Sequence, residues 1–414
     1  MSRLPWVAAA LLLWACGEST TAPGACPDYC PPARLEVVDT VLQGVFKNEE
    51  WYQGYVPPYS APAMQVVSTG AEPASRAVIR FTPFSPEITI GGELVAVSQT
   101  DSFRLRLQIL RRSTEVADLE LQVHRLPVSV DTSSAWSDLA PYFADSTLLA
   151  TIVIPPDSFV PTDTTNADST AVAVDTIGVT LPPSAFPTLE ADSFVTAVGI
   201  AVRADQAGYV DLGAKEGARG ASYLSWFVKV DSSGTPVDRT ESRVPGFDSF
   251  VVAEETSVPN DVLVVGGVPS ARTFMRIDLP DDIMSLSTIV RADLLLTPAA
   301  PVIGGPGDTV SVVVYGVSAD FGPKSPPLAL ASDTIPRGVA HLPVGFADTV
   351  RIDVTTLLLP LQADSTLPRT MLLRVLPEGA TLGQLLFHAS SSAVARPALH
   401  VTYVPFFTIE EPLP

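Results

Sequence analysis

The sequence predicts an all-β protein with two tandem antiparallel β-sandwiches of the jelly-roll kind, preceded by an export signal and a short linker. Hydrophobic residues make up 46% of the 414 positions, and after the N-terminal stretch they occur in short runs of strand length. The 39 prolines and 26 glycines are scattered among these runs and leave little room for long helices. Several segments recur in the same order, which indicates two copies of one module.

Residues 1–15 predict a signal peptide, and the residue that follows predicts a lipid anchor. Arg3 precedes an apolar stretch that ends at Ala15 and is too short to cross a bilayer as a helix. The residues Leu-Trp-Ala-Cys at 13–16 resemble the bacterial lipobox, which implies that Cys16 is acylated and becomes the first residue of the mature chain. An ordinary secretory signal with an incidental cysteine is the alternative.

Residues 16–35 predict a flexible tether, because Gly, Ser, Thr and Pro dominate them. The lipobox resemblance also implies sorting to the outer membrane, since Gly17 rather than an aspartate follows the cysteine. Cys26 and Cys30 stand close together in a chain that meets an oxidising compartment, which favours a small disulfide loop over two free thiols. A metal site would need two further ligands, and none is nearby in the sequence.

The two copies of the module are visible as matching segments. The residues SRAVIRF from Ser75 correspond to ARTFMRI from Ala271, and DTVLQGVF from Asp39 corresponds to DSFVVAEE from Asp248. Both members of each pair have the strand-like pattern of a sheet with one buried face. Several such segments in the same order are hard to explain by composition alone.

These matches set the expected domain boundaries. A polar stretch with Gly and Pro separates the copies, as expected of a linker. We therefore expect a first sandwich over residues 36–232, a linker over 233–244, a second sandwich over 245–406 and a tail over 407–414.

The second copy is similar to the DNRLRE-type domain of bacterial surface proteins. The matching residues are DSFVVAEETSVPNDVLVVGG, FMRIDLP, ADLLLTP and the closing RPALHVTYVP, whereas STIVRADLLL keeps only the arginine and the leucine pattern of the motif that names the family. In the first copy, Trp136 lies in SSAWSDLAPYF, which looks like the family's Trp-containing segment. The resemblance implies extracellular β-sandwiches and carbohydrate binding.

Charge and motifs argue against several classes of function. The chain has 45 acidic and 25 basic residues and a net charge of −20, which disfavours nucleic acid and anionic lipid as partners. It contains no nucleophile elbow, zinc-protease helix, phosphate-binding loop or dinucleotide fingerprint. We expect no cofactor and no catalysis. A hydrolase whose residues meet from distant parts of the sequence is the alternative from another class.

One polar loop has the residue types that bind calcium. Residues 161–170 include Asp163, Asn166 and Asp168, and side-chain oxygens in a flexible loop can hold Ca²⁺. The spacing departs from the EF-hand pattern, and a solvated loop is the alternative. We therefore expect no metal site, with these three residues as the calcium candidates.

The aromatic residues of EEWYQGYVPPY have the strongest binding character. They are Trp51, Tyr52, Tyr55 and Tyr59, in a part of the first copy that is longer than its counterpart in the second. Aromatic rings with a polar edge suit sugars or peptides, because they offer a large apolar face at low cost in entropy. The alternative is that the rings close one end of the sandwich core.

The sequence as a whole predicts a lipoprotein of the outer membrane, facing the periplasm or the cell surface, whose modules bind without catalysis. The expected partners are the membrane, through the lipid on Cys16, and either a glycan or an envelope protein. A structural spacer or assembly role in the envelope is the alternative among non-catalytic functions.

Overall fold

The computed structural model is all-β, which confirms the predicted fold class. It describes residues 36–406 except 55, 71–73, 86, 155–174, 183–194, 219, 233–234, 253–257 and 321–334. The described α-helices are short: α2 (Trp136–Leu139) and α3 (Asp281–Met284) are single turns, and α4 (Thr355–Ala363) has nine residues. Strands therefore build most of both hydrophobic cores, and α3 and α4 add residues to the second.

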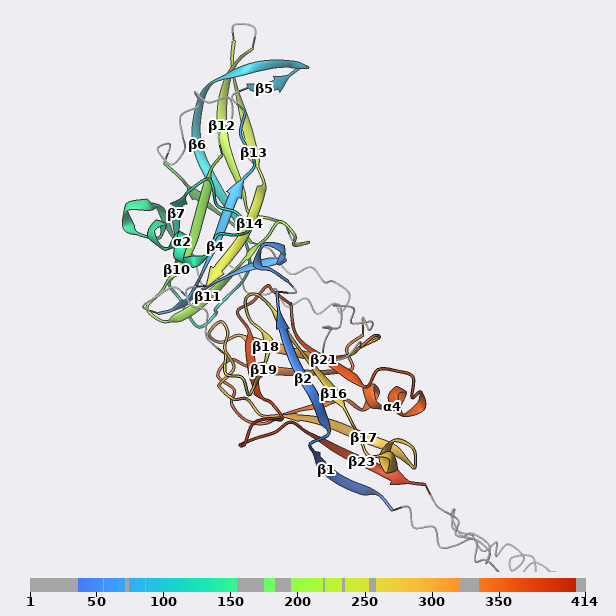
Figure 1. Ribbon diagram of the computed structural model, residues 1–414. Coiled ribbons are helices and arrows are strands. Elements are labelled where there is room, and N and C mark those ends of the chain that lie inside the picture. The colour runs from blue at the N-terminus through green and yellow to red at the C-terminus, as the bar shows by residue number, and fades with distance from the viewer. Residues whose placement is uncertain are drawn as a thin grey trace, which may run out of the picture.

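Two sheets form the first sandwich, in the upper half of Figure 1. One has the strand order β14-β4-β10-β7-β8, and the other has the order β13-β12-β6-β11-β3, with β5 and β9 also paired to β6. The strand bounds are β3 Ala63–Thr69, β4 Ser75–Phe81, β5 Glu87–Ile90, β6 Glu93–Arg112, β7 Leu119–Leu126, β8 Leu148–Ile154, β9 Asp175–Thr180, β10 Ala197–Arg203, β11 Ala207–Gly213, β12 Tyr223–Ser232, β13 Thr235–Arg243 and β14 Pro245–Val252.

Strand β4 shows how the sequence pattern builds this sandwich. Ala77 and Ile79 point into the core that also holds Leu105 and Leu107 of β6. Alternate side chains of a strand point to opposite faces of its sheet. Val78 accordingly belongs to a separate cluster on the outer face of the sheet.

The second sandwich occupies the lower half of Figure 1. One layer has the order β19-β18-β21-β16, with β2 on the other side of β16, and the other layer includes the order β1-β23-β17-β20. β15 pairs with β22, which is bridged to the chain after β17. The strand bounds are β1 Val38–Gln43, β2 Phe46–Gln53, β15 Val262–Gly266, β16 Ala271–Ile277, β17 Ser287–Leu296, β18 Thr309–Gly316, β19 Gly338–Pro343, β20 Val350–Asp353, β21 Thr370–Leu376, β22 Gln384–His388 and β23 Ala398–Pro405.

The two sandwiches exchange equivalent pairs of strands. β1 pairs with β23 and β2 pairs with β16, so the N-terminal strands complete the second sandwich, where Figure 1 shows them in blue among gold and red strands. β13 pairs with β12 and β14 pairs with β4, so the strands at the start of the second sequence copy complete the first sandwich. β1–β2 and β13–β14 therefore occupy the same two places in the two sandwiches.

This exchange differs from the domain boundaries expected from the sequence. Residues 38–53 were expected in the first sandwich and pair in the second, and residues 245–252 show the reverse. The expected linker is largely strand β13, whose residues are mostly exposed because it lies at the edge of its sheet. An edge strand carries the polar residues that a linker also carries. In the structure, the counterpart of β14 is β2. The sequence comparison had instead matched β14 with the segment from Asp39, which is mostly β1.

A buried polar junction joins the two sandwiches. Gln65 of β3 is fully buried; its Nε2 donates to Asp308 Oδ2 at 3.3 Å, and its Oε1 accepts from the Leu382 amide at 2.7 Å. Arg111 of β6 donates through Nε to Asp211 Oδ2 at 2.6 Å and through Nη1 to Asp308 Oδ1 at 3.2 Å. Because Asp308 and Leu382 belong to the second sandwich, these bonds fix one sandwich against the other.

Candidate functional site

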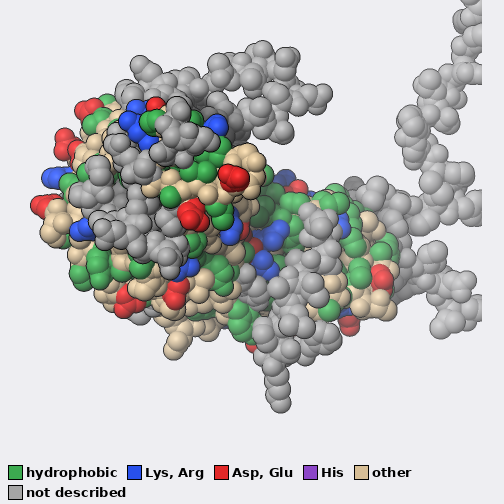
Figure 2. Space-filling view, turned by 90° about the horizontal axis from the view of Figure 1, so that it is seen from above, with side chains coloured by type: hydrophobic (Ala, Val, Ile, Leu, Met, Phe, Trp, Pro, Cys, Tyr) green, Lys and Arg blue, Asp and Glu red, His purple; other side chains and the backbone are tan. Residues whose placement is uncertain are grey.

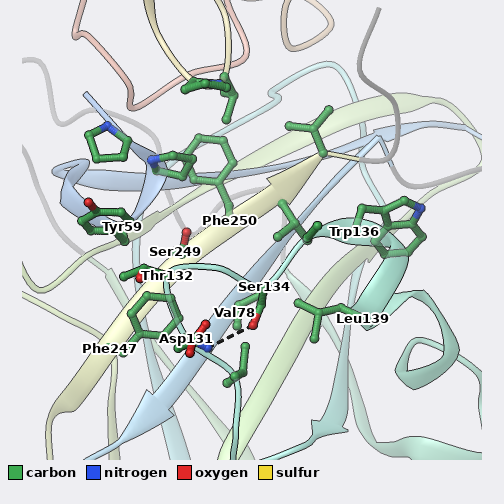
Figure 3. Close-up of a pocket in the computed structure, with 18 of the residues that line it drawn as sticks. Tyr59, Val78, Asp131, Thr132, Ser134, Trp136, Leu139, Phe247, Ser249 and Phe250 are labelled. Atoms are coloured by element: carbon green, nitrogen blue, oxygen red, sulfur yellow. Dashed lines mark hydrogen bonds between the residues drawn. The ribbon is translucent and has the colours of Figure 1, made fainter. Parts of the chain in front are cut away.

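A groove of about 380 Å³ lies on the outer face of β14 and β4, beside the junction of the two sandwiches (Figure 3). Its floor is formed by β14 and β4. One wall is the segment that contains α2, and the other is the connection from β2 to β3 with the short helix η1 (Pro58–Ser60). Val268 and Pro269, from the turn between β15 and β16, add a contribution from the second sandwich.

The wall with α2 is a cap over the five-stranded sheet. The cap and the sheet meet in a small cluster of buried residues that is separate from the main core. The cluster consists of Val78, Leu126, Val130, Leu139 and Ala197. Gly199 of β10 lets the cap approach, because a Cβ there would lie 2.5 Å from Cζ of Phe143. The cap therefore rests on the sheet with little room to shift.

Two arginines of β4 hold the aromatic rings at the groove. The Arg76 guanidinium lies 3.7 Å from the ring centroid of Trp136, a close cation–π contact. Arg80 donates through Nη1 to the Val130 carbonyl at 2.7 Å and lies 5.7 Å from the ring of Phe247. The positions of Trp136 and Phe247 are thus set from the same strand.

Polar groups surround the apolar floor. Asp131 accepts hydrogen bonds from the Ser133 hydroxyl at 2.6 Å and amide at 2.8 Å, and these bonds lower the pKa of Asp131 below its ordinary value. The Asp131 amide donates to Ser134 Oγ at 3.0 Å, the dashed line in Figure 3. Thr132 and Ser249 place their hydroxyls between the Tyr59 and Trp136 sides of the groove (Figure 3). The site therefore offers a carboxylate, several hydroxyls and aromatic rings together.

The structure divides the predicted aromatic residues between two places. Tyr59, in η1, lines the groove and is 40% exposed. Trp51 and Tyr52 lie in β2 and line a different cleft at the edge of the second sandwich. Trp51 packs partly against the second core, and the Tyr52 ring meets Phe274 edge-on at 6.0 Å. The segment expected as an insertion is thus partly a strand.

Other predicted residues lie outside the described part of the chain. They are Cys16, Cys26, Cys30, Tyr55, Asp163, Asn166 and Asp168. The lipid anchor, the disulfide and the calcium candidates stay predictions. Among the described residues, no group of three or more His, Cys, Asp or Glu side chains could hold a metal ion.

The groove also contains residues that the sequence analysis missed. Phe247 and Ser249 belong to β14, which was expected in the second sandwich. The sequence contained one signal for this face of the sheet, a pair of arginines that recurs in both copies. The pair is Arg76 and Arg80 in β4, and Arg272 and Arg276 in β16. In the second sandwich these arginines form ion pairs with carboxylates instead of contacting a cap.

Two Ser–His contacts bear on the hydrolase alternative. Ser311 Oγ lies 2.9 Å from His341 Nδ1, and Ser392 Oγ lies 3.1 Å from His388 Nδ1. A serine nucleophile needs a histidine that a third group orients. Within the described ranges, the carboxylate contacts of histidine are made by His400 and not by these two. The contacts therefore give the hydrolase alternative no support.

Comparison with known proteins adds no relative to these observations. No family model matches the chain, and no curated protein matches it. Across the residues that the structure describes, no helix is long and apolar enough to cross a membrane. The arguments about function therefore depend on the chain's own residues.

Proposed function

We propose that the protein is a lipid-anchored, non-catalytic glycan-binding protein of the outer membrane, and that a saccharide occupies the groove beside Trp136. The main support is the combination of Trp136, Tyr59 and Phe247 with the polar groups of Asp131, Thr132 and Ser249 in one groove. Small-molecule sites are typically mostly apolar concave surfaces with a few polar groups that fix orientation.

The chemistry of a sugar ring fits these groups. A pyranose has apolar C–H faces that pack on aromatic rings, and hydroxyls on its edge that donate and accept hydrogen bonds. The Asp131 carboxylate is ionised at neutral pH, as an aspartate ordinarily is, and can accept from sugar hydroxyls. Charged acceptors form stronger hydrogen bonds than neutral ones. Asp131 and the ring of Tyr59 are therefore the two groups to test first.

The charge distribution on the face seen in Figure 2 agrees with an uncharged ligand. Figure 2 shows acidic and basic side chains of the described residues scattered over the face seen from above, among hydrophobic and polar ones. A partner bound mainly by charge would require charges of one sign gathered on one face. A neutral glycan needs no such gathering.

The groove is tested with the mature chain and immobilised polysaccharides. Tyr59→Ala should weaken binding several-fold, because the ring contributes on the order of 1 kcal/mol to the free energy of binding. The melting temperature should be nearly unchanged, because the ring is exposed. Tyr142→Ala, which removes an exposed tyrosine of the cap that does not line the groove, is the matched control and should bind like the wild type. Absence of binding to every polysaccharide would favour the spacer role, and release of reducing ends would favour the hydrolase.

The anchor is tested by metabolic labelling with an alkyne fatty acid. The wild type should carry the label, and Cys16→Ala should lose it and keep its signal peptide. Cys26→Ala is the control, because the same thiol chemistry lies ten residues further along the tether. Label retained by Cys16→Ala would contradict the lipid anchor and leave the groove proposal unaffected.

A further inference from the structure

An exposed apolar patch lies at one end of the second sandwich. Its residues are Val37, Leu286, Val290 and Phe406, and each side chain is more than half exposed. They lie at the beginning of β1, in the first part of β17 and at the end of β23. Figure 1 shows β1 and β23 at the end of the second sandwich that is farthest from the first. These four residues are named the terminal patch below.

Strand pairing brings these side chains together. The Phe406 amide donates to the Leu286 carbonyl at 2.7 Å and continues the pairing of β23 with β17, so these two side chains lie on the same face. Continued by one residue, the register of β1 against β23 places Val37 beside Val404, two residues before Phe406. Val290 is the extra residue of a β-bulge in β17. The terminal patch therefore extends over three neighbouring strands.

The corresponding strand of the first sandwich exposes polar residues instead. β13 holds the place there that β1 holds in the second sandwich, and it exposes Asp238, Arg239 and Ser242. Charged residues are the usual means by which a protein protects an edge strand from unwanted contacts. β1 instead exposes Val41 in addition to Val37. Apolar side chains gathered in one exposed place mark an interaction surface.

The position of the proposed anchor indicates what covers this surface. The tether predicted over residues 16–35 leads directly into β1. A flexible linker of about twenty residues has a root-mean-square end-to-end distance of about 25 Å. A lipid on Cys16 would therefore hold the terminal patch within reach of the bilayer. The charged residues next to the patch in sequence are one acid, Glu36, and one base, Arg291, so contact with lipid would be apolar rather than electrostatic.

We propose that the terminal patch lies against the bilayer that holds the anchor, with its four side chains in contact with uncharged lipid. Apolar side chains of peripheral proteins enter the interfacial region to a depth of about 5–10 Å. The inference rests on the lipid anchor of the proposed function and adds an orientation to it. The second sandwich faces the membrane, and the groove beside Trp136, near the junction with the first sandwich, is held away from it.

The test uses the acylated mature chain, with Cys26 and Cys30 replaced by serine, in vesicles of phosphatidylcholine. One new cysteine, from Val290→Cys or Phe406→Cys, carries an environment-sensitive fluorophore. Nitroxide-labelled phosphatidylcholine should quench both labels, because a nitroxide quenches the fluorophores that it contacts. Val153→Cys, at an exposed valine of β8 in the first sandwich, is the matched control and should stay unquenched.

Removal of the apolar side chains gives a second measurement. A label at Val37→Cys should also be quenched in these vesicles. Val290→Ser combined with Phe406→Ser should reduce that quenching several-fold, because serine lacks the apolar surface that enters the interface. Both replaced residues are exposed, so the melting temperature should stay near that of the wild type. Full quenching in the double variant would contradict the docking role of the patch.

The outcomes separate this inference from the proposed function. Labels at Val290→Cys and Phe406→Cys that are quenched no more than the label at Val153→Cys would overturn the docking and leave the anchor standing. A blue shift of the Phe406→Cys label without vesicles that grows with protein concentration would show that a second copy of this chain covers the patch, and would also overturn the inference. Failure of the wild type to take up the alkyne fatty acid would overturn the anchor, and the inference with it.

Discussion

Asp248 is a buried carboxyl group on β14, and burial raises its pKa to about 7. It is 3% exposed, and the Lys215 amide donates to its Oδ2 at 2.8 Å, which offsets part of the cost of burial. The neighbouring carboxyl of Glu216 raises the pKa further. An aspartate in an unfolded chain titrates near pKa 3.9. The folded protein therefore holds a proton on Asp248 over a pH range in which the unfolded chain has released it.

This difference predicts how stability depends on pH. Between about pH 4 and about pH 7 the folded state binds more protons, so the free energy of unfolding falls as the pH rises through this window. Asp248→Asn keeps the acceptor for Lys215 and removes the charge, and should reduce that fall by on the order of 2 kcal/mol. Urea titrations at about pH 5 and about pH 8 measure it.

Two further variants make this test specific. Asp211, whose pKa burial raises to about 6, contributes in the same direction, so some of the fall should persist in Asp248→Asn. Asp118→Asn removes an exposed carboxylate and should leave the pH dependence unchanged. An equal fall in the wild type and Asp248→Asn would show that Asp248 is ionised in the folded protein.

At the scale of elements, the exchanged strands carry core residues into the sandwich of the other copy. Phe46 of β2 is 2% exposed in the second core, and Phe250 of β14 is 1% exposed in the first. Truncation of a buried phenylalanine costs about 3–5 kcal/mol, from lost burial and the cavity left behind. Each strand pair therefore stabilises a sandwich made mostly of residues from the other part of the sequence.

The pair of phenylalanines gives reciprocal predictions. Phe46→Ala should speed hydrogen exchange in β16 and β23, which lie far from it in sequence, more than in the neighbouring strand β3. Phe250→Ala should speed exchange in β4 and β10 more than in β15. Hydrogen exchange followed by mass spectrometry measures both. Faster exchange of β3 and β4 in Phe46→Ala would contradict the exchanged pairing.

The strand pattern was predictable from the sequence, but the pairing of strands was not. The repeat correctly matched SRAVIRF with ARTFMRI, and these strands, β4 and β16, hold the same place in their sheets. Alternation of apolar residues tells which face of a strand is buried, but not which strand lies beside it. Tyr59 could be named in advance as a binding residue, whereas Trp136 was named only through the family resemblance. Phe247 and Ser249 could not be joined to them, because the exchange brings β14 to the groove.

At the scale of the whole molecule, the junction of Gln65, Asp308 and Arg111 couples the sandwiches. Gln65→Leu removes the side-chain hydrogen bonds to Asp308, the Leu382 amide and Asp211, and leaves each of these groups with one partner fewer in a buried site. Leaving a buried polar group unsatisfied costs about 1–3 kcal/mol. This loss falls on the contact between the sandwiches rather than on either core.

Calorimetry tests the coupling. We expect the wild type to melt in one transition and Gln65→Leu to melt in two, because each sandwich keeps its own core when the junction weakens. Gln122→Leu, on β7, removes a glutamine whose side chain donates to Glu120 on the same strand, and it should preserve one transition. Two transitions in the wild type would show that the junction does not couple the sandwiches.

The exchanged strands also bear on how the proposed lipoprotein would withstand proteases. The chain passes from the N-terminal tether through β1 and β2 before it reaches the first sandwich at β3. A single cut in the connection at 54–62 would break the covalent link between the anchor and the rest of the chain. β1 and β2 would nevertheless stay paired with β23 and β16. The clipped protein would be retained at the membrane without a covalent link, by strand pairing and by the packing of Phe46 in the second core. Shedding would require unfolding of the second sandwich as well as the cut.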